Sequence, residues 1–262
     1  MEIINPQTVI VTGGATGIGY AVAEQFVRRG ANVFVNGRTE AKLRVAADRL
    51  GEPARVGFLA CDVTVPANAI RIIDAARERF GRVDVLINNA GIFHCKPFTD
   101  YGIDELDSFL GYLRGMFSLT QAAVRQMRRQ GDGGAIINIS TVLAFNGIAA
   151  FPSSAPMAAK GGITALTKNL SIELAADNIR INAVAPGVVP TPLYGELTEV
   201  QLNGLHEMQP LGRYGTPKDI ADAVLYLANA TWVTGVILPV DGGVNAGGDG
   251  SNRRNRNITL AA

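Results

Sequence analysis

Residues 153–162, SSAPMAAKGG, place a lysine in a setting that suits chemistry. Lys160 is the only ionisable residue in this run of small side chains, and two glycines follow it. Pro156 precedes the lysine by one helical turn, and its side chain has no proton to give. Proline is well tolerated in the first turn of a helix, because its missing N–H would be unpaired there. We therefore expect Pro156 to begin a helix that Ser153 or Ser154 caps.

A second segment suits the binding of phosphate groups. The apolar run Thr8–Val11 leads into the turn Thr12-Gly13-Gly14-Ala15-Thr16-Gly17-Ile18-Gly19. Glycines between a strand and a helix let the backbone approach a pyrophosphate, and the helix N-terminus supplies unpaired N–H groups. The spacing is Gly-x-x-x-Gly-x-Gly rather than the usual Gly-x-Gly-x-x-Gly, so the turn alone is also consistent with a simple tight turn.

The elements that position these residues are short apolar runs that alternate with longer amphipathic segments. Because each run is apolar nearly throughout, we expect strands that are covered on both faces. Strand–helix alternation predicts right-handed βαβ units, and hence an α/β fold with a parallel sheet. The seven predicted strands are 8–11, 32–35, 56–61, 83–88, 135–140, 180–185 and 236–240.

Three further segments lie where predicted strands end. Asn88-Asn89-Ala90-Gly91 ends the fourth strand, Pro186-Gly187-Val188-Val189-Pro190-Thr191 follows the sixth, and Asp62 follows the third. Open parallel sheets bind ligands at this edge. Together with the glycine turn, these segments resemble the short-chain dehydrogenase/reductase family over about residues 5–245.

The resemblance implies a Rossmann-type, doubly wound, seven-stranded parallel sheet in a single domain, residues 1–248. The change of composition near the C-terminus, with its three arginines, predicts a mobile tail, 249–262. The resemblance also implies that the glycines shape the phosphate turn, that Asp62 and Val63 flank the adenine, and that Thr191 reaches the carboxamide. Asn88 and Asn89 have a second interpretation, as amides that tie strands together, and the two roles do not exclude each other. The cofactor residues expected in this way are Gly13, Thr16, Gly17, Ile18, Gly19, Gly37, Arg38, Asp62, Val63, Asn89, Ala90, Gly91, Lys160, Pro186, Gly187, Val189 and Thr191.

The end of the second strand bears on the choice of nicotinamide cofactor. An acidic residue about 20 positions after the glycine turn would bind the ribose 2′-hydroxyl of NAD. Gly37 occupies this position, and Arg38 follows it. A guanidinium with no carboxylate beside it favours a 2′-phosphate, so we expect NADP(H), with NAD(H) as the alternative if Arg38 is merely solvated.

The same resemblance implies a catalytic site in which one residue is replaced by proline. In this family a tyrosine hydroxyl transfers the proton, and a lysine four residues later lowers the pKa of that tyrosine and holds the nicotinamide ribose. A serine after the fifth strand orients the carbonyl, and an asparagine on the fourth helix supports a proton relay. Lys160 takes the place of the lysine, Pro156 of the tyrosine, Thr141 (with Ser140 beside it) of the serine, and Tyr112 of the asparagine.

Another group would have to supply the proton. Tyr112 is one candidate, because the Lys160 ammonium could lower the pKa of a nearby phenol, and the alternative is a tyrosine packed in the helix core. His94 follows the Asn88–Gly91 segment closely and could act as an acid at neutral pH, or have no role. Tyr194 and His206 lie in a segment that covers the substrate in relatives and are weaker candidates.

Three functions are consistent with the residues. The first is an NADP(H)-dependent oxidoreductase acting on a small carbonyl or alcohol, with a non-standard proton donor. The second is a reductase of a conjugated C=C bond, in which Ser140 or Thr141 steadies an enolate oxygen. The third is a catalytically inactive cofactor-binding homologue with a regulatory or scaffold role.

Composition narrows the class of protein. The chain has 262 residues, of which 47% are hydrophobic, and a formal net charge of +1, so charge gives no argument for nucleic acid or an anionic membrane. Two cysteines are too few for a disulfide framework and lack the spacing of metal ligands. The chain shows no signal peptide and no apolar run of the roughly 18 residues that a spanning helix needs. We expect a cytoplasmic protein, and the resemblance implies a homotetramer or a dimer assembled through the helices near 103–130 and 155–176.

Overall fold

A parallel sheet of seven strands runs through the centre of the computed structural model, which describes residues 7–148, 151–192 and 209–246. The strand order is β3-β2-β1-β4-β5-β6-β7, and every neighbouring pair is parallel. The predicted α/β fold, with its doubly wound Rossmann-type sheet, is confirmed. The strands are β1 Thr8–Thr12, β2 Asn32–Gly37, β3 Val56–Ala60, β4 Val85–Asn88, β5 Gly134–Ile139, β6 Ile179–Pro186 and β7 Ile237–Val240.

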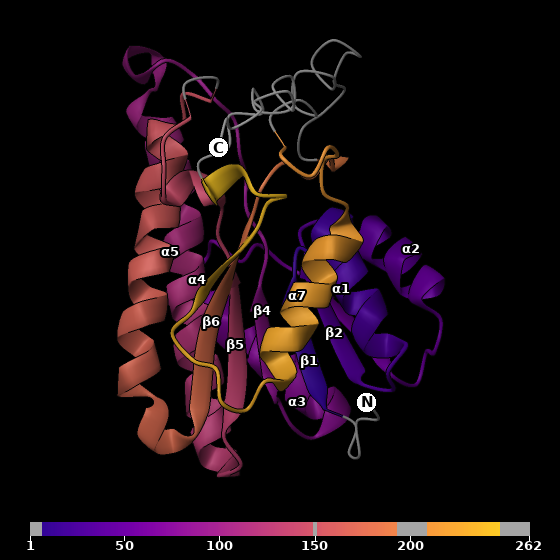
Figure 1. Cartoon of the computed structure of the whole chain (residues 1–262). Helices are drawn as coiled ribbons and strands as arrows, with labels where there is room; N and C mark the ends of the chain where they lie inside the picture. The colour runs from indigo at the N-terminus through magenta and orange to yellow at the C-terminus, as the bar shows by residue number, and fades with distance from the viewer. Residues whose placement is uncertain (1–6, 149–150, 193–208, 247–262) are drawn as a thin grey trace, which may run out of the picture.

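Helices cover both faces of this sheet (Figure 1). On β1, Val9 and Val11 pack with α1 and α7, whereas Ile10 points to the opposite face and packs with α3 and α4. This alternation explains why the strand sequences are apolar throughout. The helices are α1 Gly17–Val27, α2 Glu40–Leu50, α3 Ala67–Phe80, α4 Ile103–Gln130, α5 Ser154–Glu173 and α7 Pro217–Asn229. None of the helices within the described ranges is both long and apolar enough to cross a bilayer.

The predicted strand ends shift by one or two residues, and the predicted helix cap also needs correction. The fourth strand begins at Val85 rather than Val83, because the Asp84 carboxylate accepts the Thr8 N–H and the Val83 N–H donates to the Gln130 side chain. Pro156 is the third residue of α5, in its first turn as predicted, and Ser153 occupies the N-cap position. The Ser153 side chain, however, makes no capping hydrogen bond. The boundaries of the predicted domain stay a prediction, and the predicted tail lies outside the described residues.

The order in which the chain adds strands to the sheet reverses at β1, which pairs with β2 on one side and with β4 on the other. The chain reaches the far edge at β3, then crosses back to place β4 against β1. At such a switch point the loops after the two central strands diverge and leave a crevice at their carboxyl ends. The glycine turn after β1 and the Asn88–Gly91 segment after β4 both lie at this crevice.

A chain of buried amides and hydroxyls joins β4 and β5 to the helices behind them. Asn88 Nδ2 donates to Thr120 Oγ1 at 3.1 Å and to Asn138 Oδ1 at 2.9 Å. Asn138 Nδ2 donates in turn to Thr167 Oγ1 at 2.9 Å. All four residues are buried. The structural interpretation of Asn88 therefore holds.

Asn138→Ala removes the middle of this chain and leaves one N–H of Asn88 and one acceptor site of Thr167 without a partner. We expect the free energy of unfolding to fall by about 2–4 kcal/mol, because each orphaned polar group costs about 1–3 kcal/mol. Denaturant unfolding measures this change, with Asn169→Ala on the exposed side of α5 as the matched control, expected within about 0.5 kcal/mol of the wild type. Equal losses in the two variants would contradict the role given to the amide chain.

Candidate active site

The turn after β1 leaves room for a ligand where side chains would otherwise stand. Gly13 and Gly17 have φ values of +64° and +56°, which side-chain-bearing residues rarely adopt. A Cβ at Gly19 would lie 2.3 Å from the Gly13 carbonyl oxygen, so only glycine fits beneath the turn. Thr16 occupies the N-cap of α1 without a capping hydrogen bond. This cradle, at a helix N-terminus, fits the pyrophosphate of a dinucleotide.

Hydrogen bonds between the first and fourth strands fix this turn in place. Thr12 Oγ1 accepts the N–H groups of Asn89 and Ala90, each at 3.0 Å. Asn89 Nδ2 donates back to the Thr12 carbonyl at 2.9 Å and to the Gly13 carbonyl at 3.3 Å. We call these bonds the Thr12–Asn89 clamp. The clamp joins the two loops at the switch point, and together they form one rim.

A pocket with an empty volume of about 1020 Å³ opens over this rim, and we call it the cofactor pocket. It brings together residues from the ends of β1, β2, β3 and β4, as the resemblance implies. Gly19 is absent from its lining, because it packs beneath the turn. The predicted residues that line it are Gly13, Thr16, Gly17, Ile18, Gly37, Arg38, Asp62, Val63, Asn89, Ala90, Gly91 and Thr191.

Two cations meet at one end of the cofactor pocket. Arg38 follows β2 and Lys42 lies in the first turn of α2, and both side chains line the pocket. Both residues are exposed, and neither forms an ion pair with another described residue. Asp62, which also lines this pocket, accepts hydrogen bonds from the Thr64 N–H and hydroxyl, each at 2.8 Å. The sequence analysis did not identify Lys42, which contributes to the pocket through the position of α2.

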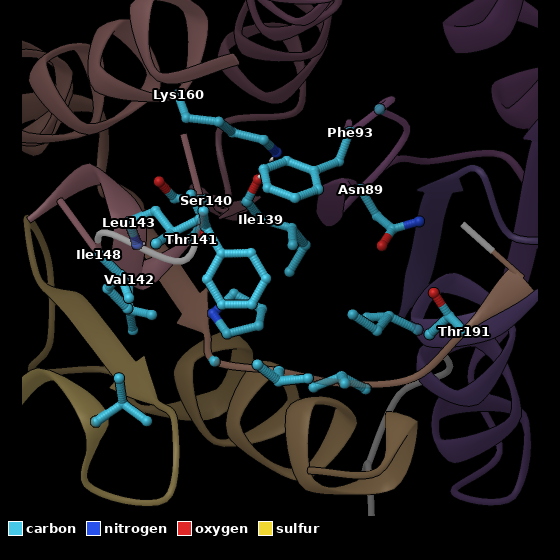
Figure 2. A pocket seen from close by; sticks show the side chains of 18 of the residues that line it. Asn89, Phe93, Ile139, Ser140, Thr141, Val142, Leu143, Ile148, Lys160 and Thr191 are labelled. Carbon is cyan, nitrogen blue, oxygen red and sulfur yellow. Dashed lines mark hydrogen bonds between the residues drawn. The ribbon is translucent and has the colours of Figure 1, made fainter. Parts of the chain in front are cut away.

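A second pocket, with an empty volume of about 940 Å³, adjoins the first and has mostly apolar walls (Figure 2). We call it the apolar pocket. Ile18, Asn89, Gly91 and Thr191 line both pockets, so the two are continuous. The side chains that give the apolar pocket its character are Ile18, Ile92, Phe93, Ile139, Val142, Leu143, Ile148, Phe151, Val188, Val189 and Val244.

The predicted catalytic residues Lys160, Ser140 and Thr141 all line the apolar pocket. Figure 2 shows the Lys160 side chain reaching toward Phe93 and Ile139. Lys160 Nζ donates to the Ile139 carbonyl at 2.6 Å, and burial lowers the pKa of Lys160 to about 8. The Ser140 hydroxyl shares a hydrogen bond of 3.3 Å with Thr164 Oγ1. Thr141 Oγ1 accepts the Leu143 N–H at 3.3 Å.

Four of the expected cofactor residues line the apolar pocket instead of the cofactor pocket, and one of these is Lys160. Pro186, Gly187 and Val189 line the apolar pocket and not the pocket that holds Arg38. The reason is that the segment after β6 crosses the sheet edge beside β7. A Cβ at Gly187 would lie 2.7 Å from the Asp241 Cα, so the backbone passes close to the end of β7 there.

Tyr112 does not have the electrostatic environment that we expected. It lines the cofactor pocket and a smaller cavity that it shares with Pro156 and Lys160, but not the apolar pocket. Burial raises the pKa of Tyr112, and the charges that act on the phenol are Arg38 and Asp62. The prediction that the Lys160 ammonium lowers this pKa is therefore wrong, because burial dominates and Lys160 is not among the charges that act on the phenol.

His94 belongs to a cluster outside these pockets. Its Nε2 lies 3.0 Å from Glu105 Oε1, which also accepts a hydrogen bond from Lys96 Nζ at 2.7 Å. The His94 ring packs against Phe109, with centroids 4.9 Å apart, and its carbonyl accepts the Tyr101 hydroxyl at 2.8 Å. His94 thus fastens the loop after β4 to α4. Two further candidates, Tyr194 and His206, lie outside the described residues.

Comparison with known proteins agrees with this geometry. Residues 13–245 match the family described as Enoyl-(Acyl carrier protein) reductase. The chain is 38% identical over 247 residues to 3alpha-hydroxysteroid dehydrogenase of Mediterraneibacter gnavus, which covers 92% of this chain and 97% of that protein. The structure of a short-chain type dehydrogenase/reductase from Mycobacterium marinum superposes with a TM-score of 0.86 at 32% identity, covering 91% of this chain and 95% of that one.

The chain belongs to the short-chain dehydrogenase/reductase family. Two other similar proteins extend the comparison to cofactors. The NADP-dependent (R)-specific alcohol dehydrogenase of Lentilactobacillus kefiri is 34% identical over 92% of this chain and 97% of its own length. The 3-ketoacyl-(acyl-carrier-protein) reductase from Brucella melitensis, complexed with NADH, superposes with a TM-score of 0.85 at 30% identity, covering 91% of this chain and 98% of that one. The family consists of oxidoreductases that use NAD(P), and the cofactor pocket fits such a dinucleotide.

Gly19→Ala tests the cradle. Its Cβ collides with the Gly13 carbonyl and forces the turn to move, so we expect the dissociation constant for NADPH to rise at least about tenfold. Fluorescence titration measures the affinity, and far-ultraviolet circular dichroism confirms the fold. Gly161→Ala, where an added Cβ meets nothing within 4 Å, is the matched control and keeps wild-type affinity. Wild-type affinity in Gly19→Ala would rule out this position for the pyrophosphate.

Proposed function

We propose that this chain is an NADP(H)-dependent oxidoreductase that interconverts a small carbonyl compound and its alcohol. The observation that carries the proposal is the continuity of the cofactor pocket with the apolar pocket, across Ile18, Asn89, Gly91 and Thr191. When bound, NADP(H) supplies or accepts the hydride. The walls of the apolar pocket would hold the substrate, and Ser140 and Thr141 would orient its oxygen by hydrogen bonds.

The preference for NADP(H) rests on charge at the end of β2. Arg38 and Lys42 both line the cofactor pocket, and Gly37 stands where a carboxylate would repel a 2′-phosphate. Thr39, at the N-cap of α2, adds the N-terminus of a helix to the same corner. The similarity to an NADP-dependent alcohol dehydrogenase supports this assignment, and NAD(H) remains the alternative cofactor.

The proton donor of this reaction is non-standard. Pro156, which we place where the family has its tyrosine, carries no hydroxyl and lies against the smaller cavity rather than the apolar pocket. The helix runs on through Pro156 to Lys160 without a break, so the lysine keeps its place on α5. Proline at this position is compatible with the fold and incompatible with proton transfer from residue 156.

The apolar pocket favours a neutral, largely hydrocarbon substrate. Ser140, Thr141 and Lys160 supply three of its few polar side chains, and most of the remaining lining is apolar, which suits a substrate with few oxygen functions rather than a polyhydroxylated compound. The similarity to a hydroxysteroid dehydrogenase is in keeping with such a substrate.

A second candidate function is the reduction of a conjugated C=C bond. The matched family carries the description of an enoyl reductase, and the hydroxyls of Ser140 and Thr141 could hold an enolate oxygen. A third, the inactive homologue, would bind cofactor and turn over neither class of substrate. The cytoplasmic location and the homotetramer, or dimer, also stay predictions.

Turnover distinguishes these functions. We expect NADPH consumption in the presence of neutral cyclic ketones and none with enoyl thioesters, each monitored by absorbance after NADPH binding has been confirmed by fluorescence. Consumption with enoyl thioesters alone would favour the second function. Tight binding with no consumption on either panel would favour the inactive homologue.

Arg38→Ala tests the cofactor preference. We expect the dissociation constant for NADPH to rise about 10- to 100-fold, because the loss of a charge-assisted hydrogen bond costs roughly 1.5–3 kcal/mol. The affinity for NADH should change little, since NADH has no 2′-phosphate. Gly37→Asp should shift the preference toward NADH, and Arg49→Ala, at the far end of α2, serves as the control. Equal losses of affinity for NADPH and NADH in Arg38→Ala would contradict a contact between Arg38 and the 2′-phosphate.

A further inference from the structure

The apolar pocket contains one ionisable side chain among the described residues that line it, and this is Lys160. The other polar side chains of its lining are the Asn89 and Gln209 amides and the hydroxyls of Ser140, Thr141 and Thr191. An alcohol or amide does not release a proton near neutral pH without help from a base. A carbonyl oxygen bound in this pocket therefore has one described side chain that can give it a proton.

The other candidate acids within the described residues stand apart from this pocket. Tyr112 faces the cofactor pocket and the smaller cavity, and burial raises its pKa away from neutrality. His94 is held in its cluster with Glu105 and Lys96 and lines neither the apolar pocket nor the cofactor pocket. Pro156 has no proton to offer.

The position of the ammonium suits proton transfer. Lys160 lines the pocket, and its Nζ donates to the Ile139 carbonyl at 2.6 Å. An ammonium has three N–H donors, so two remain for the pocket. A Cβ built on Gly91, which lines both pockets, would lie 3.8 Å from Nζ. The lysine therefore lies beside the junction where a reacting carbonyl would meet the cofactor.

We propose that Lys160 is itself the proton donor and acceptor of this enzyme, in place of the missing tyrosine. The proposal rests on the proposed function. In reduction, hydride from NADPH forms the new C–H bond at the carbonyl carbon, and the C=O π pair takes a proton from Nζ. NADPH is oxidised, the carbonyl is reduced to the alcohol, and the neutral amine regains its proton from water. Oxidation of the alcohol runs through the same groups in reverse.

The acidity of Lys160 matches this role. Burial lowers its pKa to about 8, whereas an exposed lysine would hold its proton too tightly near neutral pH. Tyr112, from α4, is the ionisable group that shares the smaller cavity with it, and burial is the cause of the lysine shift. The ammonium is the acid, so reduction should be fast below pH 8 and slow as pH rises through this value. Oxidation needs the neutral amine and should show the opposite trend.

Lys160→Arg separates proton transfer from simple charge. Arginine keeps the positive charge but does not deprotonate in proteins, so we expect the rate of ketone reduction to fall at least roughly 100-fold. We expect NADPH affinity to stay within a few-fold of the wild type. Lys168→Arg, on the exposed side of the same helix, is the matched control with unchanged rates. Lys160→Met provides a second variant, with circular dichroism to confirm that both variants fold.

A readout without turnover accompanies the kinetics. The rate at which an amine-selective reagent labels Lys160 in the cofactor-free protein, followed by peptide mass spectrometry across pH, should rise with a midpoint near 8. A midpoint near 10 would overturn the proposal. A Lys160→Arg enzyme that keeps the wild-type rate and pH profile would also overturn it. So would the loss of turnover in Tyr112→Phe, Tyr194→Phe or His206→Asn while Lys160→Arg remains active. If the wild-type protein turns over no carbonyl or alcohol, the proposed function is wrong. The midpoint of the labelling curve then still tests the lowered pKa of Lys160.

Discussion

The Thr12–Asn89 clamp is the interaction on which the rest of the site depends. A single hydroxyl accepts two backbone N–H groups from the loop after β4, and one amide returns two hydrogen bonds to the turn after β1. The two loops leave the sheet in different directions at the switch point, so without this clamp they would diverge freely. Because Asn89 and Gly91 belong to both pockets, the clamp also sets where cofactor and substrate meet.

Much of this arrangement could be predicted from the sequence, because it follows from local patterns. Apolar runs such as those ending at Thr12 and Asn88 give the strands, and the order of glycines gives the turn. Contacts between distant segments could not be predicted in this way. The fastening of His94 to Glu105 depends on how a loop folds back on α4, and the raised pKa of Tyr112 depends on its burial. Lys42 was missed because it contributes to the pocket only once α2 has packed beside β2.

The two halves of the site differ in what they require of the chain. The cofactor half is built from backbone geometry, glycines and a pair of cations, and most of its expected residues line one pocket. The apolar pocket combines hydrocarbon walls with the hydroxyls of Ser140, Thr141 and Thr191, the amides of Asn89 and Gln209, and one lysine. Its apolar walls do more than hold a substrate, since the burial that they create also lowers the pKa of Lys160. Lys160 lines this pocket, whereas Pro156 lines the smaller cavity beside it.

The central claim is that hydride moves between NADP(H) and a carbonyl carbon in this protein although residue 156 is a proline. The most direct measurement uses NADPH that carries deuterium at the transferable position of nicotinamide C4, followed by mass spectrometry and nuclear magnetic resonance of the alcohol. The account predicts one deuterium at the carbinol carbon of the product from a neutral ketone. NADPH that binds tightly while no deuterated alcohol forms from any neutral ketone would contradict it.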